Sequence, residues 1–232
     1  MEKEPSQPQV QQKEDAGQNL GGSKKNYFKQ KIALFFGYNG TAYHGLQKQK
    51  DLKEKTTVES CLEIALHEAG FITESNFGDL KKNAWQRCSR TDKGVHAAYN
   101  GINCKLNILD SFVDLSPQEL EEEKKKDDRK LMKSKLRRDD IIKLINKFLT
   151  EDIRCYGFRI VTKNFDIKLN AASRRYEYLC PLKMFYPYNR ETYGNNYATD
   201  EARNAQIVET LKTYVKKFVG TRNYHNYTKK GN

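Results

Sequence analysis

The sequence lacks any apolar run long enough to cross a lipid bilayer, so no membrane protein is predicted. Its five cysteines form no Cys-x-x-Cys pair, which excludes the usual zinc and disulfide frameworks. The first fifteen residues carry four acids and no hydrophobic stretch, which argues against a secretory signal and fits a mitochondrial transit peptide poorly. We therefore expect a reducing compartment, the nucleus or the cytoplasm, with the mitochondrion as the alternative.

Positive charge is in excess, because 42 Lys and Arg residues stand against 30 Asp and Glu and give a net charge of +12. A cationic surface gains affinity for polyanions by releasing counterions from phosphates, so a nucleic acid is the expected partner. From the charge alone, a basic protein that binds no nucleic acid is an equally good interpretation. The 14 Tyr and 11 Phe exclude a purely disordered basic tail and supply rings suited to base stacking.

The order of predicted elements indicates an α+β fold. Residues 1–27 are rich in Gln, Glu, Lys, Gly and Ser and are predicted to form a disordered tail. Apolar periodicity beyond the tail predicts strands at 32–36, 100–108, 153–162 and 174–181, and helices at 58–69, 141–149 and 201–219. This order predicts a mixed or antiparallel sheet with helices packed on one face.

A charged insertion is predicted at residues 114–138. Ser116, Pro117 and Glu119 supply a cap, a first-turn proline and a capping-box acid, which together predict a helix start. The run Glu-Glu-Glu-Lys-Lys-Lys that follows favours a solvated helix with opposite charges close together. We expect a surface insertion without a catalytic part.

The densest group of functional side chains is the run Arg-Thr-Asp-Lys-Gly-Val-His at residues 90–96. Arg90 and Lys93 flank the carboxylate of Asp92, and nearby positive charge favours the ionised form of an acid. An ionised, oriented carboxylate can serve as a nucleophile, a general base or a metal ligand. The same run is typical of a salt-bridged turn, since Asp and Gly are common turn residues, and this alternative stays open.

Two other segments combine rings with polar groups. Arg174, Tyr176 and Tyr178 would share one face of the strand predicted at 174–181, which suits base stacking and phosphate binding. Tyr is also an ordinary strand residue, so this segment alone indicates little. The loop at 38–47 contains two glycines with Tyr, His and Gln side chains, and contains no Gly-Lys-Ser/Thr phosphate loop. It is equally typical of a structural turn.

Taken in order, these segments resemble the TruA family of pseudouridine synthases, and more closely its eukaryotic branch of Pus1-type tRNA enzymes. The resemblance covers roughly residues 31–228. Its most specific part is residues 89–97, Ser-Arg-Thr-Asp-Lys-Gly-Val-His-Ala. The accompanying segments occur in the family's order at 38–47, 144–154, 165–166, 175–179 and 218–227.

The resemblance implies an isomerase that converts uridine to pseudouridine in folded tRNA, or in another structured RNA, without a metal or cofactor. Asp92 would be the nucleophile, Arg90 would orient it, and Tyr176 would pack against the target base. The carboxylate could attack C1′, add to uracil C6 or assist a glycal route, and these three alternatives stay open. The residues implied as RNA or phosphate contacts are Lys93, His96, Tyr43, Gln47, Arg174 and Arg175.

The second half of the family pattern is incomplete in this sequence. We assign residues 28–185 to a catalytic half and 186–232 to the start of a second half, whose later strands, one with a further active-site arginine, are missing. The His that usually follows the Gly-Thr pair is Arg222. An incomplete sheet exposes an edge that invites a homodimer or a protein partner. The alternative function is an inactive RNA-binding or ribonucleoprotein component derived from the family.

Overall fold

The computed structural model describes residues 27–49, 56–126, 129–185 and 201–227. The chain divides into two compact units, one ending at Ser173 and one beginning at Arg174, whereas the predicted boundary lies at 185/186. Each unit is described by itself. Apart from Tyr27, the predicted disordered tail lies outside the described residues.

Four antiparallel strands form the sheet of the first unit, in the order β2-β3-β1-β4. Their bounds are β1 Tyr27–Tyr38, β2 Gln86–Arg87, β3 Ala97–Leu109 and β4 Ile153–Ile160. The apolar strand β1 lies between two long partners, with Ile32 opposite Cys104 of β3 and Ile160 of β4. The sheet confirms the predicted α+β class and is antiparallel throughout.

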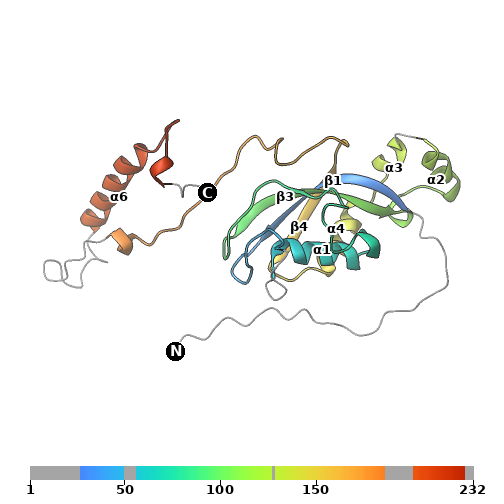
Figure 1. Ribbon diagram of the computed structural model, residues 1–232, viewed down its shortest axis with the longest axis horizontal. Coiled ribbons are helices and arrows are strands. Elements are labelled where there is room, and N and C mark those ends of the chain that lie inside the picture. The colour runs from blue at the N-terminus through green and yellow to red at the C-terminus, as the bar shows by residue number, and fades with distance from the viewer. Residues whose placement is uncertain (1–26, 50–55, 127–128, 186–200, 228–232) are drawn as a thin grey trace, which may run out of the picture. The chain divides into compact units, whose positions relative to one another are not determined.

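Two amphipathic helices cover one face of this sheet, as Figure 1 shows. They are α1, Val58–Glu68, and α4, Arg138–Lys147. The predicted cap at Thr57 is confirmed, because its side chain accepts a hydrogen bond from the backbone of Ser60. The side chains between sheet and helices that are wholly buried include Leu34, Phe36, Leu62, Leu66, Ile102, Ile141 and Ile145. Burial of these apolar side chains is the main force that holds the helices against the sheet.

The charged insertion is more closely attached to the core than predicted. Helix α2, Pro117–Lys124, starts with the predicted capping box at Ser116 but ends before the charged run does. The short helix α3, Lys130–Ser134, follows and buries Met132 completely. The insertion therefore packs Leu120 and Met132 into the core and also buries the acid Glu123, which pairs with Lys126. Two 3-10 turns complete this unit, η1 Glu74–Asn76 and η2 Asp110–Phe112.

The opposite face of the sheet is only partly covered. The coil that follows β4 crosses this face in Figure 1 and buries Ile167 to 6% exposure. The backbone N–H of Ile167 donates to Asn103 Oδ1 of β3 at 2.9 Å. Lys31 of β1 donates through Nζ to the carbonyls of Lys163 and Phe165, which holds the same coil down.

The prediction of a strand at residues 174–181 is wrong. Residues 174–180 form no strand, although their alternating side chains fit one. A strand needs a hydrogen-bonded neighbour, and the backbone of these residues joins no ladder in the described part of the chain. Side-chain alternation reports a face and says nothing about whether a partner strand exists.

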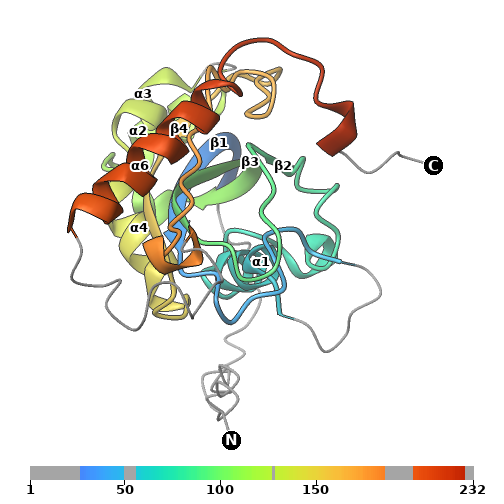
Figure 2. The ribbon, with the colours of Figure 1, turned by 90° about the vertical axis from the view of Figure 1, so that its left-hand side faces the viewer.

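The second unit contains helix α6, Glu201–Lys216, and the 3-10 turns η3, Leu182–Phe185, and η5, His225–Tyr227. Helix α6 begins at the predicted residue and ends four residues before Gly220, which adopts a φ of 114°. None of its side chains is buried within this structure. Across the described residues, the helices are too short or too polar to span a membrane. Figure 2 gives a second view of all elements.

Candidate active site

Asp92 lies at the tip of a turn that joins the edge strand β2 to β3. The backbone N–H of Val95 donates to the Asp92 carbonyl at 3.2 Å and closes this turn. Gly94 takes a φ of 78°, a left-handed conformation that side chains disfavour, which explains the glycine in the motif. The Asp92 side chain is exposed. The turn thus presents the carboxylate to solvent on a short, hydrogen-bonded support.

The loop between β1 and α1 clamps this turn from the side. Leu46 N donates to the Thr91 carbonyl at 3.1 Å, and Gly94 N donates to the Tyr43 carbonyl at 3.2 Å. A Cβ on Gly45 would lie 2.7 Å from the Thr91 oxygen, and one on Gly40 would lie 2.0 Å from the Val95 oxygen. Both glycines are therefore needed for the backbones to approach, and the segments predicted from sequence at 38–47 and 89–97 are brought together.

Side-chain hydrogen bonds fix both ends of the Asp92 turn. Tyr38 and Thr91 share a hydrogen bond of 2.7 Å between Oη and Oγ1. His96 accepts from the Gly40 backbone through Nδ1 at 3.2 Å. Cys88 N donates to the Gly101 carbonyl at 2.8 Å. These bonds hold the residues before and after Asp92 against β1 and β3.

Tyr43 is placed in the core and not as an RNA contact. Its side chain is 1% exposed, and its hydroxyl shares a hydrogen bond of 2.7 Å with Thr150 Oγ1. Burial raises the pKa of Tyr43 to about 12, so the hydroxyl keeps its proton at neutral pH. The ring therefore supports the loop that clamps Asp92. Sequence alone made it look like a binding residue because aromatic side chains in glycine loops serve both purposes.

The charged side chains around Asp92 all reach solvent. Arg90 donates to Gln47 Oε1 at 3.3 Å, which ties the two loops together. In residues 27–49 and 56–126, no ion pair within 4.0 Å joins Asp92 to Arg90 or Lys93. Orientation of Asp92 by Arg90 stays a prediction, as do RNA contacts by Lys93, His96 and Gln47.

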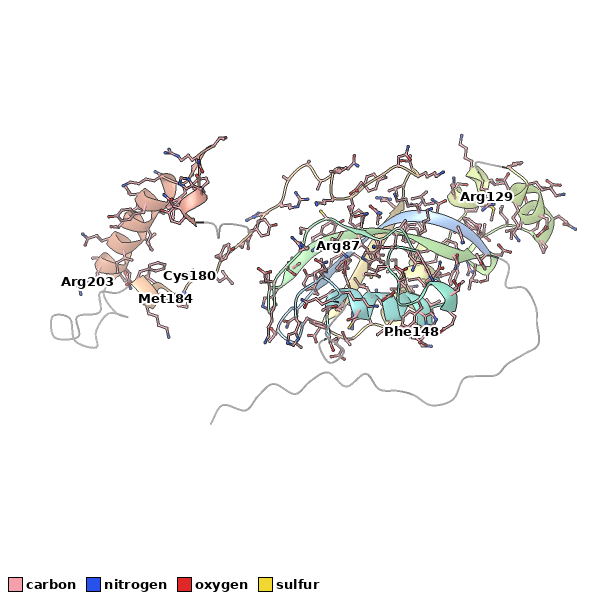
Figure 3. All side chains as sticks on the ribbon, viewed as in Figure 1. Arg87, Arg129, Phe148, Cys180, Met184 and Arg203 are labelled. Carbon is pink, nitrogen blue, oxygen red and sulfur yellow. The ribbon has the colours of Figure 1, made fainter. Side chains whose placement is uncertain are left out.

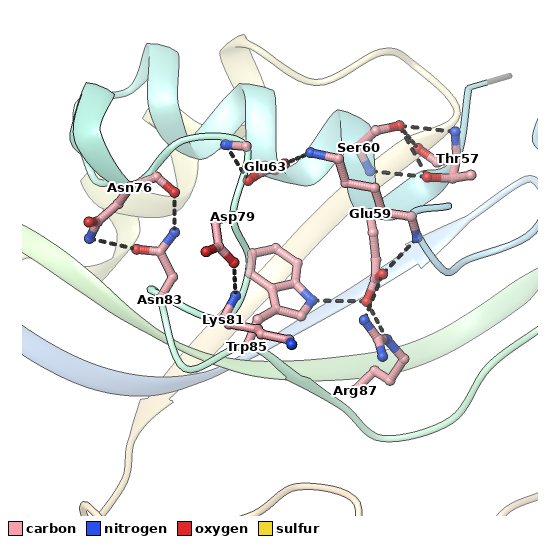
Figure 4. A network of polar contacts seen from close by, with 12 residues as sticks. Thr57, Glu59, Ser60, Glu63, Asn76, Asp79, Lys81, Asn83, Trp85 and Arg87 are labelled. Atoms are coloured by element: carbon pink, nitrogen blue, oxygen red, sulfur yellow. Dashed lines mark hydrogen bonds and ion pairs between the residues drawn. The ribbon is translucent and has the colours of Figure 1, made fainter. Parts of the chain in front are cut away.

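A buried carboxylate that sequence reasoning missed anchors the start of the loop that carries Asp92. Glu59 of α1 is wholly buried and accepts from Arg87 Nε at 2.6 Å and Arg87 Nη2 at 3.0 Å (Figure 4). It also accepts from Trp85 Nε1 and from Lys48 N, both at 2.9 Å. Four donors satisfy this carboxylate, as a buried charge requires. Glu59 thereby fixes β2 and the end of the clamping loop to helix α1.

A second acid on the same helix repeats this device. Glu63, four residues after Glu59, is 1% exposed and pairs with Lys48 while accepting from Gly78 N at 2.9 Å. The available signal was the i, i+4 spacing of two acids between the apolar positions of α1, which places them on one helix stripe. In Figure 3, Arg87 is labelled among the side chains of the first unit.

Three predicted site residues belong to the second unit. Tyr176 is 61% exposed, and Arg174 and Arg175 are also exposed. Arg175 pairs with Glu177 at 2.8 Å between Nη2 and Oε1. Both side chains are exposed, so water competes for this ion pair and it contributes little stability. Since the two units are described separately, packing of Tyr176 against a base held at Asp92 stays a prediction. In the described part of the chain, no group of three His, Cys, Asp or Glu side chains could hold a metal ion.

Curated proteins similar to this chain share one activity in their names. The chain is 31% identical over 200 residues to a Mus musculus protein named pseudouridylate synthase 1 homolog, covering 86% of this chain and 40% of that protein. It is 38% identical over 159 residues to tRNA pseudouridine synthase 1 of Candida albicans, covering 68% and 21%. It is 39% identical over 153 residues to the protein of the same name in Saccharomyces cerevisiae, covering 66% and 22%.

The chain thus spans roughly a fifth to two fifths of the length of these relatives. No family model matches it. The Mus musculus and Candida albicans relatives are nevertheless 30% or more identical over two thirds or more of this chain, and their names give pseudouridylate or pseudouridine synthase 1. The chain belongs to the TruA family of pseudouridine synthases, in its tRNA pseudouridine synthase 1 branch.

Proposed function

We propose that this chain converts uridine to pseudouridine in tRNA, with Asp92 as the nucleophilic carboxylate. The observation that carries the proposal is the Asp92 turn, held by backbone bonds from the 38–47 loop and exposed at its tip. A carboxylate that is fixed through its backbone and open to solvent can meet a substrate without a prior rearrangement. The names of the relatives support the reaction and the tRNA substrate.

The reaction conserves every atom of the substrate. The C1′–N1 bond of uridine breaks, the uracil rotates, and a C1′–C5 bond forms while C5 loses a proton and N1 gains one. The Asp92 carboxylate can act at C1′, at C6 or through a glycal route, and all three need it ionised. The nearby cations Arg90 and Lys93 would attract the RNA backbone.

The target uridine must leave the RNA stack to reach Asp92. Unstacking costs a few kcal/mol, which an aromatic surface beside the extruded base can offset. We assign Tyr176 this role, because it is an exposed ring next to two arginines that suit phosphates. Arg174 and Arg175 then act as RNA contacts together with Lys93, His96 and Gln47. Other structured RNAs offer the same groups, and a second copy or another protein could complete the enzyme.

The test is pseudouridine mapping on unmodified tRNA incubated with the purified 232-residue chain. We expect pseudouridine at defined positions with the wild-type chain and none with Asp92→Asn, because an amide is a far weaker nucleophile than a carboxylate. The affinity for tRNA should stay within a few fold, since the variant keeps the size of the side chain. Asp114→Asn, an exposed acid of the insertion, is the matched control and should leave turnover unchanged.

Normal turnover by Asp92→Asn would refute the assignment of the nucleophile. Absence of pseudouridine from the wild-type chain, with tRNA binding retained, would refute the proposed activity and favour the RNA-binding alternative.

A further inference from the structure

Three aromatic rings form a row on the open face of the sheet, one from each long strand. Phe35 of β1 and Tyr99 of β3 lie nearly parallel, with ring centroids 5.4 Å apart and 16° between their planes. Tyr99 and Tyr156 of β4 continue the row at 6.1 Å and 11°. At these separations the rings are offset, so each leaves part of its face uncovered. We call these three residues the aromatic row.

The row is held in place by the backbone around it. The Tyr156 hydroxyl donates to the Ala98 carbonyl at 3.1 Å and so reaches across β1 to β3. A Cβ on Gly37 would lie 2.1 Å from that hydroxyl, so the glycine is what allows the ring to cross. A Cβ on Gly101 would lie 3.2 Å from Phe35 Cδ1. Rings that are already fixed lose little side-chain entropy when a ligand binds.

The row is open to solvent in the first unit. Tyr99 is 66% exposed and Tyr156 is 55% exposed. The coil after β4 covers the neighbouring part of this face, where Ile167 would meet a Cβ on Gly101 at 2.8 Å. Two large rings side by side on a rigid sheet are an exposed patch of the kind that marks a binding surface.

The three strands that carry the row have charged side chains of a single sign. Strands β1, β3 and β4 contain no Asp or Glu. Strand register places five cations on the same face as the row, because directly paired residues point to the same side. These cations are Lys29, Lys31, Lys105, Arg154 and Arg159. An aromatic surface on strands that carry cations and no acids matches a polyanion that carries flat rings.

We propose that the aromatic row binds unpaired nucleobases of RNA by stacking, while the surrounding lysines and arginines hold the phosphates. Single strands are bound in this way by positive grooves with stacking rings. A protein partner fits less well, since Lys is depleted from protein–protein interfaces. The chain enters β3 at Ala97 directly after the Asp92 turn and reaches Tyr99 two residues later. In placing these bases beside the nucleotide at Asp92, the inference rests on the proposed function.

Binding of two RNA probes tests the stacking role of Tyr99. Fluorescence anisotropy of a labelled single-stranded uridine dodecamer and of unmodified tRNA is measured with the full chain at fixed salt. We expect Tyr99→Leu to weaken dodecamer binding roughly 5- to 50-fold, as loss of one stacked base predicts, and Tyr99→Phe to bind like the wild type. The slope of affinity against salt should stay unchanged in both variants, because no charge is removed.

A matched control removes an aromatic ring elsewhere. Phe148, at the C-terminal cap of α4, is 39% exposed and lies outside the sheet (Figure 3). Phe148→Leu should leave RNA affinity unchanged. As a second readout, 2-aminopurine placed within the dodecamer should lose fluorescence on binding to the wild type and Tyr99→Phe, and regain it with Tyr99→Leu.

Wild-type affinity of Tyr99→Leu for both RNAs would overturn the inference, as would an equal loss in Phe148→Leu. Unchanged RNA affinity with altered self-association would also overturn it and assign the row to a second copy of the chain. These assays need no turnover, so they separate the inference from the proposed function. If RNA binding depends on Tyr99 but no pseudouridine forms, only the proposed activity is refuted. If pseudouridine forms but RNA binding does not depend on Tyr99, only the stacking inference is refuted.

Discussion

Among the described residues of the first unit, one face of the sheet is sealed by α1 and α4, whereas the coil around Ile167 covers part of the other. The sealed face carries side chains such as Leu34 and Ile102, which are wholly buried. The open face carries the aromatic row and five cations on the same three strands. The alternation of a strand thus lets one segment hold the fold together and bind a ligand at once. Substitutions on the two faces should therefore separate stability from RNA affinity.

The largest expected effect on stability comes from Glu59, the buried carboxylate that anchors the loop carrying Asp92. Glu59→Gln leaves Arg87 without its counter-charge and puts an amide where four donors converge. Breaking a buried ion pair in this way costs about 3 kcal/mol of the free energy of unfolding. Urea unfolding measures this loss as a lower midpoint at an unchanged slope.

Glu68→Gln is the control for this change, since it lies on the same helix with its side chain 55% exposed. Its midpoint should equal that of the wild type. If Glu59→Gln is equally stable, the network does not hold β2 to α1, and the sealed side contributes less than the structure indicates.

An intermediate effect is expected where the two loops meet. Gly40→Ala places a methyl group 2.0 Å from the Val95 carbonyl oxygen, so the loops must separate. Such overpacking costs about 1–3 kcal/mol, and the displaced Asp92 turn should lose turnover by more than the stability loss explains. Thermal unfolding and pseudouridine formation are measured on the same preparation.

The matched variant is Gly157→Ala in β4, because a Cβ there meets nothing within 4 Å. It should leave stability and turnover nearly unchanged. Equal losses in both variants would mean that glycine matters for strand formation in general and not for the contact between the loops.

The smallest effect is expected from a single charge on the open face. Lys105→Gln should weaken RNA binding only a few fold and lower the slope of affinity against salt by about 0.7, the value for one phosphate of a single strand. Stability should not change, because Lys105 is exposed. Anisotropy titrations between low and moderate salt measure the slope.

Lys143→Gln on α4 is the control, since it removes an exposed cation from the helical side of the sheet. An equal loss of slope in Lys143→Gln would show that net charge alone drives binding. RNA binding would then not distinguish the open face of the sheet from the helical side.

Local pattern was enough to predict the elements that make the sealed face. The Thr57 cap and the apolar spacing after it predicted α1, and the run at 32–36 predicted the centre of β1. The strand begins earlier, at Tyr27. Its first part alternates between exposed and buried side chains, so it contains no continuous apolar run. Strand β2 has only two residues, too few to show any period.

What could not be predicted depends on partners that are distant in sequence. Glu59 meets Arg87 28 residues away, and Tyr43 meets Thr150 107 residues away, so neither pairing leaves a local signal. The aromatic row is drawn from three separate strands and exists only through their register. For the site, the family resemblance singled out the Asp92 motif and the 38–47 loop as separate segments, while the backbone bonds that join them required the structure.

The clamp between the two loops also sets how the site can open. Leu46 and Gly94 donate their amide hydrogens across the gap, in opposite directions, to Thr91 and Tyr43. The 38–47 loop and the Asp92 turn cannot open separately, because either opening breaks both backbone hydrogen bonds that join them. Amide hydrogens at both positions should therefore exchange with solvent at a common rate, set by one concerted local unfolding event. A common rate would show that the Asp92 turn and the 38–47 loop open as one cooperative unit.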